Sequence, residues 1–409
     1  MANVSSSNGI EKYPKLRFES HTDTSRSGWE IHTLADYLFP RIEKQVPTEE
    51  APLMAFTAEG GVEPKGDRYD RSYLVKSDNK LYKRTELGDF IYSSNNLDVG
   101  SMGLNKYGTA VISDVYEIFS IKATAAPSFI DELIHRPNVL HKVLQFRQGC
   151  LYGQYRIYAD DFLSVSVWAP PKIEQQRISD FFATLDKRIA IQKKLIEHLK
   201  KYKRGVVKTL LDPKQNQRQD VIWTTDTIGN LGTFIKGAVL SKADISDFGT
   251  PFILYGELYT TYKEVVRSIV RTTQANVDDV YLSKVGDVVI PTSGETPEEI
   301  STASCIMVSN VILAGDLNIY RSTIVDGRIM SYLLNHIVNE QIARVAQGKS
   351  VVHVQASEIG KISITYPDHN EQERISQILE LIDNRIAASE KALNSVQMMK
   401  KAFLQQLFI

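Results

Sequence analysis

The side chains that could do chemistry do not form a complete catalytic motif. Gly348-Lys349-Ser350 matches the end of the phosphate-binding motif G-x-x-x-x-G-K-[ST], but Ala343 stands where the first glycine belongs, so a P-loop ATPase is not indicated. No G-x-G-x-x-G, H-E-x-x-H or G-x-S-x-G sequence occurs. We therefore expect a chain that is not catalytic by itself and that holds no metal ion.

An acidic stretch gives a second, weaker hint of chemistry. Asp368, Glu371 and Glu373 follow Pro367, and this arrangement resembles part of a metal-dependent nuclease site. The stretch also lies where a long helix is expected to begin, and the positive end of a helix dipole favours carboxylates there. We interpret it as a helix start rather than as a nuclease site.

Polar loops are the remaining candidates for a binding site. One pair follows a Gly-Asp block at Gly88 and again at Gly286, and a second pair follows a predicted helix in each half. Loops that share a place but not a sequence suggest two related domains with different targets, whereas ordinary surface variation is the simpler explanation for any single residue. The candidate binding residues are Ser93, Asn95, Asn96, Lys106, Tyr107, Arg147, Gln148, Tyr152 and Gln154 in the first half and Ser293, Glu295, Thr296, Lys349, Ser350 and His353 in the second.

An internal repeat organises the chain that carries these loops. Residues 173–211 and 370–408 align without a gap at an offset of 197, and 12 of the 39 aligned pairs are identical. Trp29 and Trp223 open the two copies, and Pro170 and Pro367 precede the long segments. A period near half the chain indicates duplication of one large unit rather than a solenoid of short repeats.

Each long segment is predicted to be a helix with an apolar heptad seam. Apolar residues recur at alternating steps of four and three, and neither segment contains proline. Polar residues interrupt both seams at the same places, Gln192 with Ser389 and Lys203 with Lys400. We expect the helices to pack on each other rather than to act as separate amphipathic helices. The predicted packing residues are Ile178, Phe182, Leu185, Ile189, Ile196, Leu199, Val206 and Leu210 in the first helix and Ile375, Leu379, Ile382, Ile386, Leu393, Val396, Phe403 and Leu407 in the second.

The two predicted helices differ in charge. Residues 173–211 hold ten Lys or Arg and four acidic residues, whereas residues 370–408 hold five of each. The basic run at 200–204 is typical of a solvated helix face, and binding to DNA phosphate or to an acidic partner is the alternative.

Short β-type runs and helical patterns occupy the two regions that precede the long segments. Helices are predicted at about 128–145 and 328–346. The predicted fold class is α+β, with two similar globular domains and two long helices. Strands are predicted at 73–75, 90–92, 110–112 and 165–168 in the first region and at 288–290, 305–308, 351–352 and 362–364 in the second.

Composition and charge narrow the class of protein. The chain has 409 residues, of which 43% are hydrophobic and 24% charged, and its formal net charge is −1. This excludes a globally basic nucleic-acid binder but not a local basic face. Residues 1–15 lack the apolar core of a signal peptide, and no run approaches the ~18 apolar residues that span a bilayer. Cys150 and Cys305 are too few for a disulfide framework. We expect a cytoplasmic protein with reduced thiols and no membrane contact.

A doubled signature resembles a known family. The pattern Pro-x-x-x-Glu-Gln-x-x-Ile occurs at 170–178 and again at 367–375, and each copy opens a long predicted helix. Together with the segment 14–18 ahead of Trp29, it makes nearly the whole chain similar to the specificity subunits of type I restriction–modification enzymes, the HsdS family. The resemblance implies target-recognition domains at 1–170 and 212–367. It also implies antiparallel coiled-coil spacer helices at 171–211 and 368–409, related by a pseudo-two-fold axis.

The resemblance further implies a division of labour among subunits. This chain would read the two halves of a split, asymmetric double-stranded DNA site and would itself hold no cofactor. Its helices would dock two modification subunits that methylate adenine at N6, and restriction subunits would join to translocate and cut the DNA. S-adenosylmethionine, ATP and Mg²⁺ are expected on those partners. The implied docking residues are Glu174, Gln175, Arg177, Glu371, Gln372 and Arg374.

Two other functions stay open at this point. A coiled-coil scaffold that joins proteins without touching DNA would explain the helices but not two related domains with divergent polar loops. A methyltransferase or nuclease in its own right would need an Asn-Pro-Pro-Tyr-like motif or a convincing carboxylate cluster, and the sequence contains neither.

Overall fold

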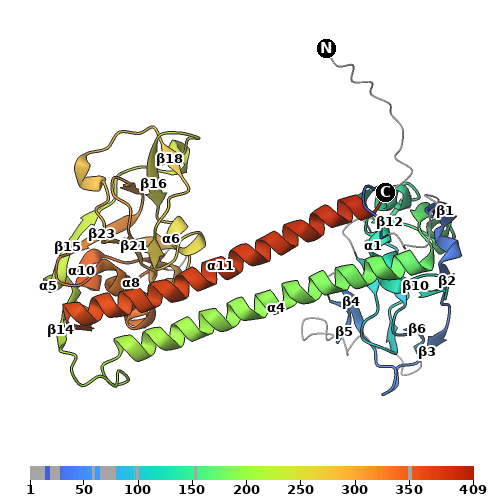
Figure 1. Cartoon of the computed structure of the whole chain (residues 1–409), viewed down its shortest axis with the longest axis horizontal. Helices are drawn as coiled ribbons and strands as arrows, with labels where there is room; N and C mark the ends of the chain where they lie inside the picture. The colour runs from blue at the N-terminus through green and yellow to red at the C-terminus, as the bar shows by residue number, and fades with distance from the viewer. Residues whose placement is uncertain are drawn as a thin grey trace, which may run out of the picture. The chain divides into compact units, whose positions relative to one another are not determined.

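The structure is a computed structural model that describes residues 14–18, 28–57, 60–64, 80–95, 97, 101–151, 154–348 and 352–409. The chain forms two compact units. The first unit comprises residues 1–191 and 394–409, and the second comprises residues 192–393. Each unit contains small β-sheets and short helices, together with part of each of two long helices (Figure 1).

The first unit is built on a four-stranded antiparallel sheet with the order β2-β10-β7-β8. Phe90, Tyr92, Phe119 and Phe162 pack against one another in its core. The strands are β1 (Glu30–Thr33), β2 (Leu38–Pro40), β3 (Lys44–Gln45), β4 (Ala55–Thr57), β5 (Gly61–Glu63), β6 (Tyr82–Thr85), β7 (Phe90–Ser93), β8 (Met102–Leu104), β9 (Ala110–Ile112), β10 (Tyr116–Ile121), β11 (Gln148–Leu151), β12 (Gln154–Arg156) and β13 (Ser166–Ala169). The short helices are α1 (Pro127–Ile134), α2 (Pro137–Leu144) and α3 (Ala159–Leu163).

The second unit is built on a five-stranded sheet with the order β15-β23-β19-β21-β17. Its strands are β14 (Trp223–Thr227), β15 (Gly232–Lys236), β16 (Thr250–Leu254), β17 (Val265–Val266), β18 (Thr272–Thr273), β19 (Asp287–Pro291), β20 (Ser293–Gly294), β21 (Ser304–Ile306), β22 (Ile312–Ala314), β23 (Leu317–Ser322), β24 (Val352–His353) and β25 (Ser363–Pro367). Its short helices are α5 (Ile228–Leu231), α6 (Glu257–Thr260), α7 (Pro297–Ile300), α8 (Gly327–His336), α9 (Asn339–Val345) and α10 (Ala356–Gly360).

The two units repeat one topology. The order β2-β10-β7-β8 in the first matches β15-β23-β19-β21 in the second, and β1 pairs with β13 as β14 pairs with β25. Helix pairs α1–α2 and α8–α9 occupy the same place in the element order. The sequence repeat therefore corresponds to a structural duplication, and the predicted α+β fold class is confirmed.

The repeated Gly-Asp block has a structural role. Gly88 and Gly286 both have positive φ angles, of 87° and 94°, which favour glycine. The buried carboxylate of Asp89 accepts a hydrogen bond from Arg41 Nε at 2.7 Å, and that of Asp287 accepts one from Arg321 Nε at 3.0 Å. The block is thus a tight turn that fixes the start of a central strand.

The long helices α4 (Lys172–Leu211) and α11 (His369–Leu407) are unbroken over 40 and 39 residues (Figure 1). Their ends lie within one residue of the predicted segments. In the second unit Gln192 contacts Ser389 and Lys203 contacts Asp383, so residue numbers rise along α4 as they fall along α11. The helices therefore pack antiparallel there.

Two predicted helices are each broken in the middle. The helix expected at 128–145 is α1 followed by α2, because Arg136 is extended ahead of Pro137. The helix expected at 328–346 is likewise α8 followed by α9. The predicted strand at 73–75 lies outside the described residues, as does residue 351, and strands occur at or within two residues of the other predicted positions.

Candidate functional site

In the first unit the two predicted polar loops meet. The loop after β7 lies beside the segment that follows the β11–β12 hairpin, because Ile157 N–H donates to the carbonyl oxygen of Ser94 at 3.1 Å. The hydroxyl of Tyr92 also donates to the carbonyl oxygen of Ile157, at 3.1 Å. Segments more than 60 positions apart in sequence thus form one surface.

A basic cleft of about 420 Å³ opens at this junction. Asn95 lines the cleft together with three cations, Lys44, Lys83 and Arg156. The cations are held in place by acidic neighbours: Lys44 pairs with an aspartate at 2.8 Å, and Lys83 and Arg156 both pair with one glutamate, at 2.8 and 3.5 Å. In such an arrangement the carboxamide can contact a base edge while the cations contact a phosphate.

Two arginine–tyrosine pairs lie in and beside the β11–β12 hairpin, and one of them contains the cleft residue Arg156. The Arg147 guanidinium lies 5.3 Å from the centre of the Tyr155 ring, and that of Arg156 lies 5.0 Å from the centre of the Tyr158 ring. Both tyrosines are exposed. Stacking on a ring restrains the guanidinium and leaves its N–H edge available to an acceptor.

In the second unit the two predicted polar loops also meet. Strands β20 and β24 pair so that Ser293 lies opposite His353, and Val354 N–H donates to the carbonyl oxygen of Thr292 at 3.0 Å. The Ser293 hydroxyl is buried and donates to Asp316 Oδ2 at 3.0 Å, so it supports the loop from inside. Glu295 and His353 are exposed on this surface.

The other candidate residues have varied environments. Ser93 is buried at the end of β7, and Thr296 caps α7 by accepting a hydrogen bond from Glu299 N–H. Exposed Gln148 donates to Asp161, and Tyr107 is half exposed. Lys106 lies away from the cleft, in a hollow of about 310 Å³ beside α4. The candidate residues Asn96, Tyr152, Lys349 and Ser350 lie outside the described residues, and only the backbone of Gln154 is described, in β12. DNA contact by any of these residues stays a prediction.

Every predicted seam position of α4 and α11 is buried or half-buried. In the first unit Phe181 and Phe403 lie edge to face, with ring centroids 5.0 Å apart. In the second unit Val206 and Leu210 pack in the cluster that contains Ile375 and Leu379. Apolar burial therefore holds the helices together in both units.

The signature glutamines join the long helices to the globular parts. Gln175 accepts from Ala126 N–H at 3.0 Å and donates to the carbonyl oxygen of Pro170 at 2.8 Å. Gln372 accepts from Asp326 N–H at 2.7 Å and donates to the carbonyl oxygen of Pro367 at 2.9 Å. Ala126 and Asp326 are the N-caps of α1 and α8. Both glutamines are buried, and their amides bond the start of each long helix to the start of a shorter one.

The signature glutamates pair with arginines of segments that lead into each unit. Arg17 Nη2 lies 2.9 Å from Glu174 Oε2, and Arg218 Nη1 lies 3.1 Å from Glu371 Oε2. Hydrogen bonds from Arg374 hold the pKa of Glu371 below its ordinary value. The glutamates are also buried, and subunit docking by the signature residues stays a prediction.

We expect Gln175→Ala and Gln372→Ala each to lower the free energy of unfolding by about 1–3 kcal/mol, because each leaves buried backbone groups without a partner. Chemical denaturation of the purified chain measures this. Gln176→Ala is the matched control, since Gln176 is exposed and its amide donates to Asp180 Oδ1 one turn along the same helix. Equal stability of the Gln175 and Gln176 variants would show that the junction is not held by these amides.

A partly buried charge network surrounds Lys203, a buried polar residue in the α4 seam. Lys203 Nζ lies 2.8 Å from Glu264 Oε2 and 2.6 Å from Asp383 Oδ1. Tyr332 donates to Asp383 Oδ2 at 2.6 Å, and His336 Nε2 lies 2.7 Å from Glu264 Oε1. Burial alone would raise the pKa of Glu264, but the hydrogen bonds from His336 and Lys203 lower it to about 2.

The depressed pKa of Glu264 gives a pH dependence. A carboxyl whose pKa is lower in the folded than in the unfolded chain stabilises the folded chain. This stabilisation is complete when the pH is above the ordinary pKa of 4.5, and it is lost as the pH falls toward the folded-state pKa of about 2. We expect Glu264→Gln to lower the free energy of unfolding by roughly 3 kcal/mol at pH 7 and by little near pH 2. Glu340→Gln, at an exposed ion pair, is the control. A difference that does not change with pH would contradict this account.

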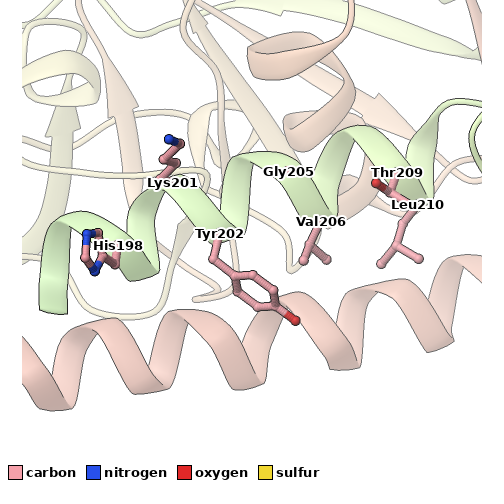
Figure 2. Close-up of a pocket in the computed structure, with 7 residues that line it drawn as sticks. All are labelled: His198, Lys201, Tyr202, Gly205, Val206, Thr209 and Leu210. Atoms are coloured by element: carbon pink, nitrogen blue, oxygen red, sulfur yellow. The ribbon is translucent and has the colours of Figure 1, made fainter.

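A groove of about 630 Å³ runs along α4 in the second unit. Figure 2 shows Tyr202, Val206 and Leu210 pointing to one side of the helix and Lys201 and Thr209 to the other. The side chain of Tyr202 is 61% exposed, and a Cβ added at Gly205 would have no atom within 4 Å. The helix thus presents an accessible, partly apolar face flanked by basic residues.

The described part of the chain offers no metal centre, since no three His, Cys, Asp or Glu side chains in it are grouped to hold an ion. Cys305 is buried, and burial raises the pKa of its thiol to about 12. No helix among the described residues is both long and apolar enough to cross a membrane.

Comparison with known proteins relates this architecture to a family. Residues 221–398 match the family model described as "Type I restriction modification DNA specificity domain". The match lies in the second half of the chain. The resemblance predicted from the doubled signature is thereby confirmed. No curated protein matches the sequence.

Two solved structures share the fold of both halves. The S subunit of a type I restriction–modification system from M. genitalium aligns with a TM-score of 0.59 and 15% identity, over 97% of this chain and 99% of that chain. A chain from work on complex assembly and conformational transition of the type I system aligns with a TM-score of 0.56 and 14% identity, over 93% and 98%. At these identities the likeness shows that the specificity-subunit fold covers nearly all of this chain.

The cations of the basic cleft were not among the binding residues predicted from the sequence. Lys44 lies in β3 and Lys83 in its neighbour β6, whereas Arg156 lies in β12, so only the fold brings them to Asn95. No local pattern in the sequence could have found them. The partners of the signature glutamates had a weak signal, because Arg17 and Arg218 each precede the tryptophan that opens a half.

Proposed function

We propose that the chain is the DNA sequence-specificity subunit of a type I restriction–modification complex and is not itself catalytic. Each unit would read one half of a split, asymmetric site in double-stranded DNA. The observation that carries this proposal is the duplication itself: in each unit two polar loops meet at one surface, and each unit is anchored to the same pair of antiparallel helices.

The side chains at these surfaces have the chemistry that DNA reading needs. In the first unit Lys44, Lys83 and Arg156 would neutralise phosphate, which supplies affinity without sequence preference. Asn95 and Arg147 would make the contacts to base edges that select a sequence. In the second unit Glu295 and His353 would make the contacts to base edges. Different side chains on one scaffold would then select different half-sites.

The long helices would separate the two readers and dock the catalytic partners. At 1.5 Å per residue the 40 residues of α4 measure roughly 60 Å, enough to set half-sites a helical turn or more apart. Two modification subunits would bind the duplicated helix surfaces, and the groove at Tyr202 offers one of them an apolar face. Restriction subunits would then join, with S-adenosylmethionine, ATP and Mg²⁺ held by the partners.

The test is single-molecule sequencing of adenine methylation in a host without other adenine methyltransferases, with this chain co-expressed beside its neighbouring modification gene. A split motif with two fixed halves is the expected result. Lys83→Ala should then weaken methylation of every site, whereas Asn95→Ala should relax one half of the motif only. A folded, soluble complex that leaves no methylated motif would favour a scaffold without DNA binding.

A further inference from the structure

Two ion pairs between the long helices are related by the internal repeat. Lys203 of α4 pairs with Asp383 of α11 at 2.6 Å in the second unit, and Lys400 of α11 pairs with Asp186 of α4 at 2.7 Å in the first. The offset of 197 that aligns the repeats exchanges the two lysines and the two aspartates. The same interaction is therefore made twice, once in each unit.

We propose that these two pairs are register locks: they fix how far α4 and α11 slide along each other, and thereby the spacing between the half-sites. The spacing part rests on the proposed function, whereas the register part does not. Lys203 and Lys400 would act as positioning residues that never touch DNA.

The apolar seam by itself does not select one register. Apolar residues recur every three or four positions along both helices, so a slip of one heptad, about 10.5 Å, again places apolar side chains opposite each other. Buried polar residues remove this degeneracy, because a slipped helix would bury a lysine without its partner. Gln192, which donates to the carbonyl oxygen of Ser389 at 3.0 Å, adds a weaker constraint of the same kind.

Each lock also holds a helix of the adjacent globular part. Tyr332 donates to Asp383 Oδ2 at 2.6 Å, and its ring centre lies 4.9 Å from Lys203 Nζ. In the first unit Glu132 Oε1 lies 3.7 Å from Lys400 Nζ. Tyr332 and Glu132 are each the sixth residue of their helix, α8 and α1. The register of the helix pair is thus coupled to the seating of each recognition unit.

The two locks differ in exposure. The side chain of Lys203 is 7% exposed, whereas that of Asp186 is 53% exposed. Salt screens exposed ion pairs more than buried ones, so the lock in the second unit should persist at high salt and the lock in the first unit should weaken.

The test replaces all four charges of the two locks by neutral side chains, and Glu264 keeps its contact with His336. The quadruple variant Lys203→Met, Asp383→Asn, Lys400→Met, Asp186→Asn keeps the seam apolar and keeps an acceptor for Tyr332, so it should fold. Cross-linking by a short bis-maleimide reads the register, in a background in which Cys150 and Cys305 are replaced by alanine. Cysteines at positions 192 and 389 report the native register. Cysteines at positions 192 and 396 report a slip of one heptad. Lys194→Met with Lys401→Met, at exposed positions of the same helices, is the matched control.

We expect the slipped cross-link to rise about tenfold in the quadruple variant and not in the control. A quadruple variant that cross-links only in the native register would overturn the locks. A charge-reversal experiment keeps the proposal testable if the quadruple variant misfolds. Lys400→Asp alone should break the exposed ion pair and reduce the native cross-link, and adding Asp186→Lys should restore that cross-link. Absence of this rescue would count against the proposal.

The cross-links need no DNA, so they separate the two hypotheses. If the register slips and the methylated motif acquires mixed spacings, both the locks and the specificity function stand. If the register slips while no variant, the parent chain included, directs methylation, the locks stand and the proposed function fails.

Discussion

A seven-residue insertion in both long helices is expected to lengthen the spacer of the methylated motif by about three base pairs, because seven residues add about 10.5 Å and each base pair rises about 3.4 Å. The inserts would follow Gln192 in α4 and Glu390 in α11. These points leave both Lys–Asp pairs and the Lys200–Glu390 pair on their own sides of the insertion. One heptad also keeps the phase of the seam.

The insertion has two matched controls, one that changes the phase of the seam and one that lengthens a single helix. Four residues in each helix advance it by slightly more than one turn, so the seam rotates away from its partner and methylation should fall sharply or stop. Seven residues in α4 alone would leave the helices unequal and should also abolish methylation. Methylation sequencing reads all three outcomes. A motif of unchanged spacing after the double insertion would show that the helices do not set the distance.

The sequence predicted the long helices more accurately than any other element. Their periodicity is local and their repeat is doubled, so both ends fall within one residue of the prediction. The helix predicted at 128–145 was too long, since the pattern outweighed the signal of Pro137, at which α2 begins. Periodicity reports a buried face, and two short helices on one core can share such a face.

The candidate site could be predicted only as loops and not as a surface. Ser93 ends β7 and Ser293 lies in β20, and both side chains are buried. The path of the backbone at these positions decides which side chain faces the interior, and residue spacing does not show that path. The cations around Asn95 come from distant strands. The signature was recognisable as a motif, but the burial of its glutamines follows from the seating of α1 and α8 on the long helices. These are all long-range contacts, which residue spacing does not encode.

Lys203→Met is expected to lower the free energy of unfolding by about 3–5 kcal/mol, because it leaves the partly buried carboxylates of Glu264 and Asp383 without the buried lysine that neutralises them. Glu264 would keep His336 and Asp383 would keep Tyr332, but neither would keep the lysine ammonium that both now contact. Chemical denaturation measures the loss. Lys208→Met, at an exposed position of the same helix, should change stability by less than about 0.5 kcal/mol.

The cause of that loss can be isolated by a second substitution. Methionine fills nearly the volume of the lysine stem, so packing should change little and the penalty should come from the uncompensated carboxylates. Adding Glu264→Gln to Lys203→Met should therefore recover stability, although Glu264→Gln alone removes it. Such a change of sign is the mark of two groups that interact directly. If the losses of stability in Lys203→Met and Glu264→Gln instead add, Lys203 stabilises the second unit through packing and not by neutralising the carboxylates.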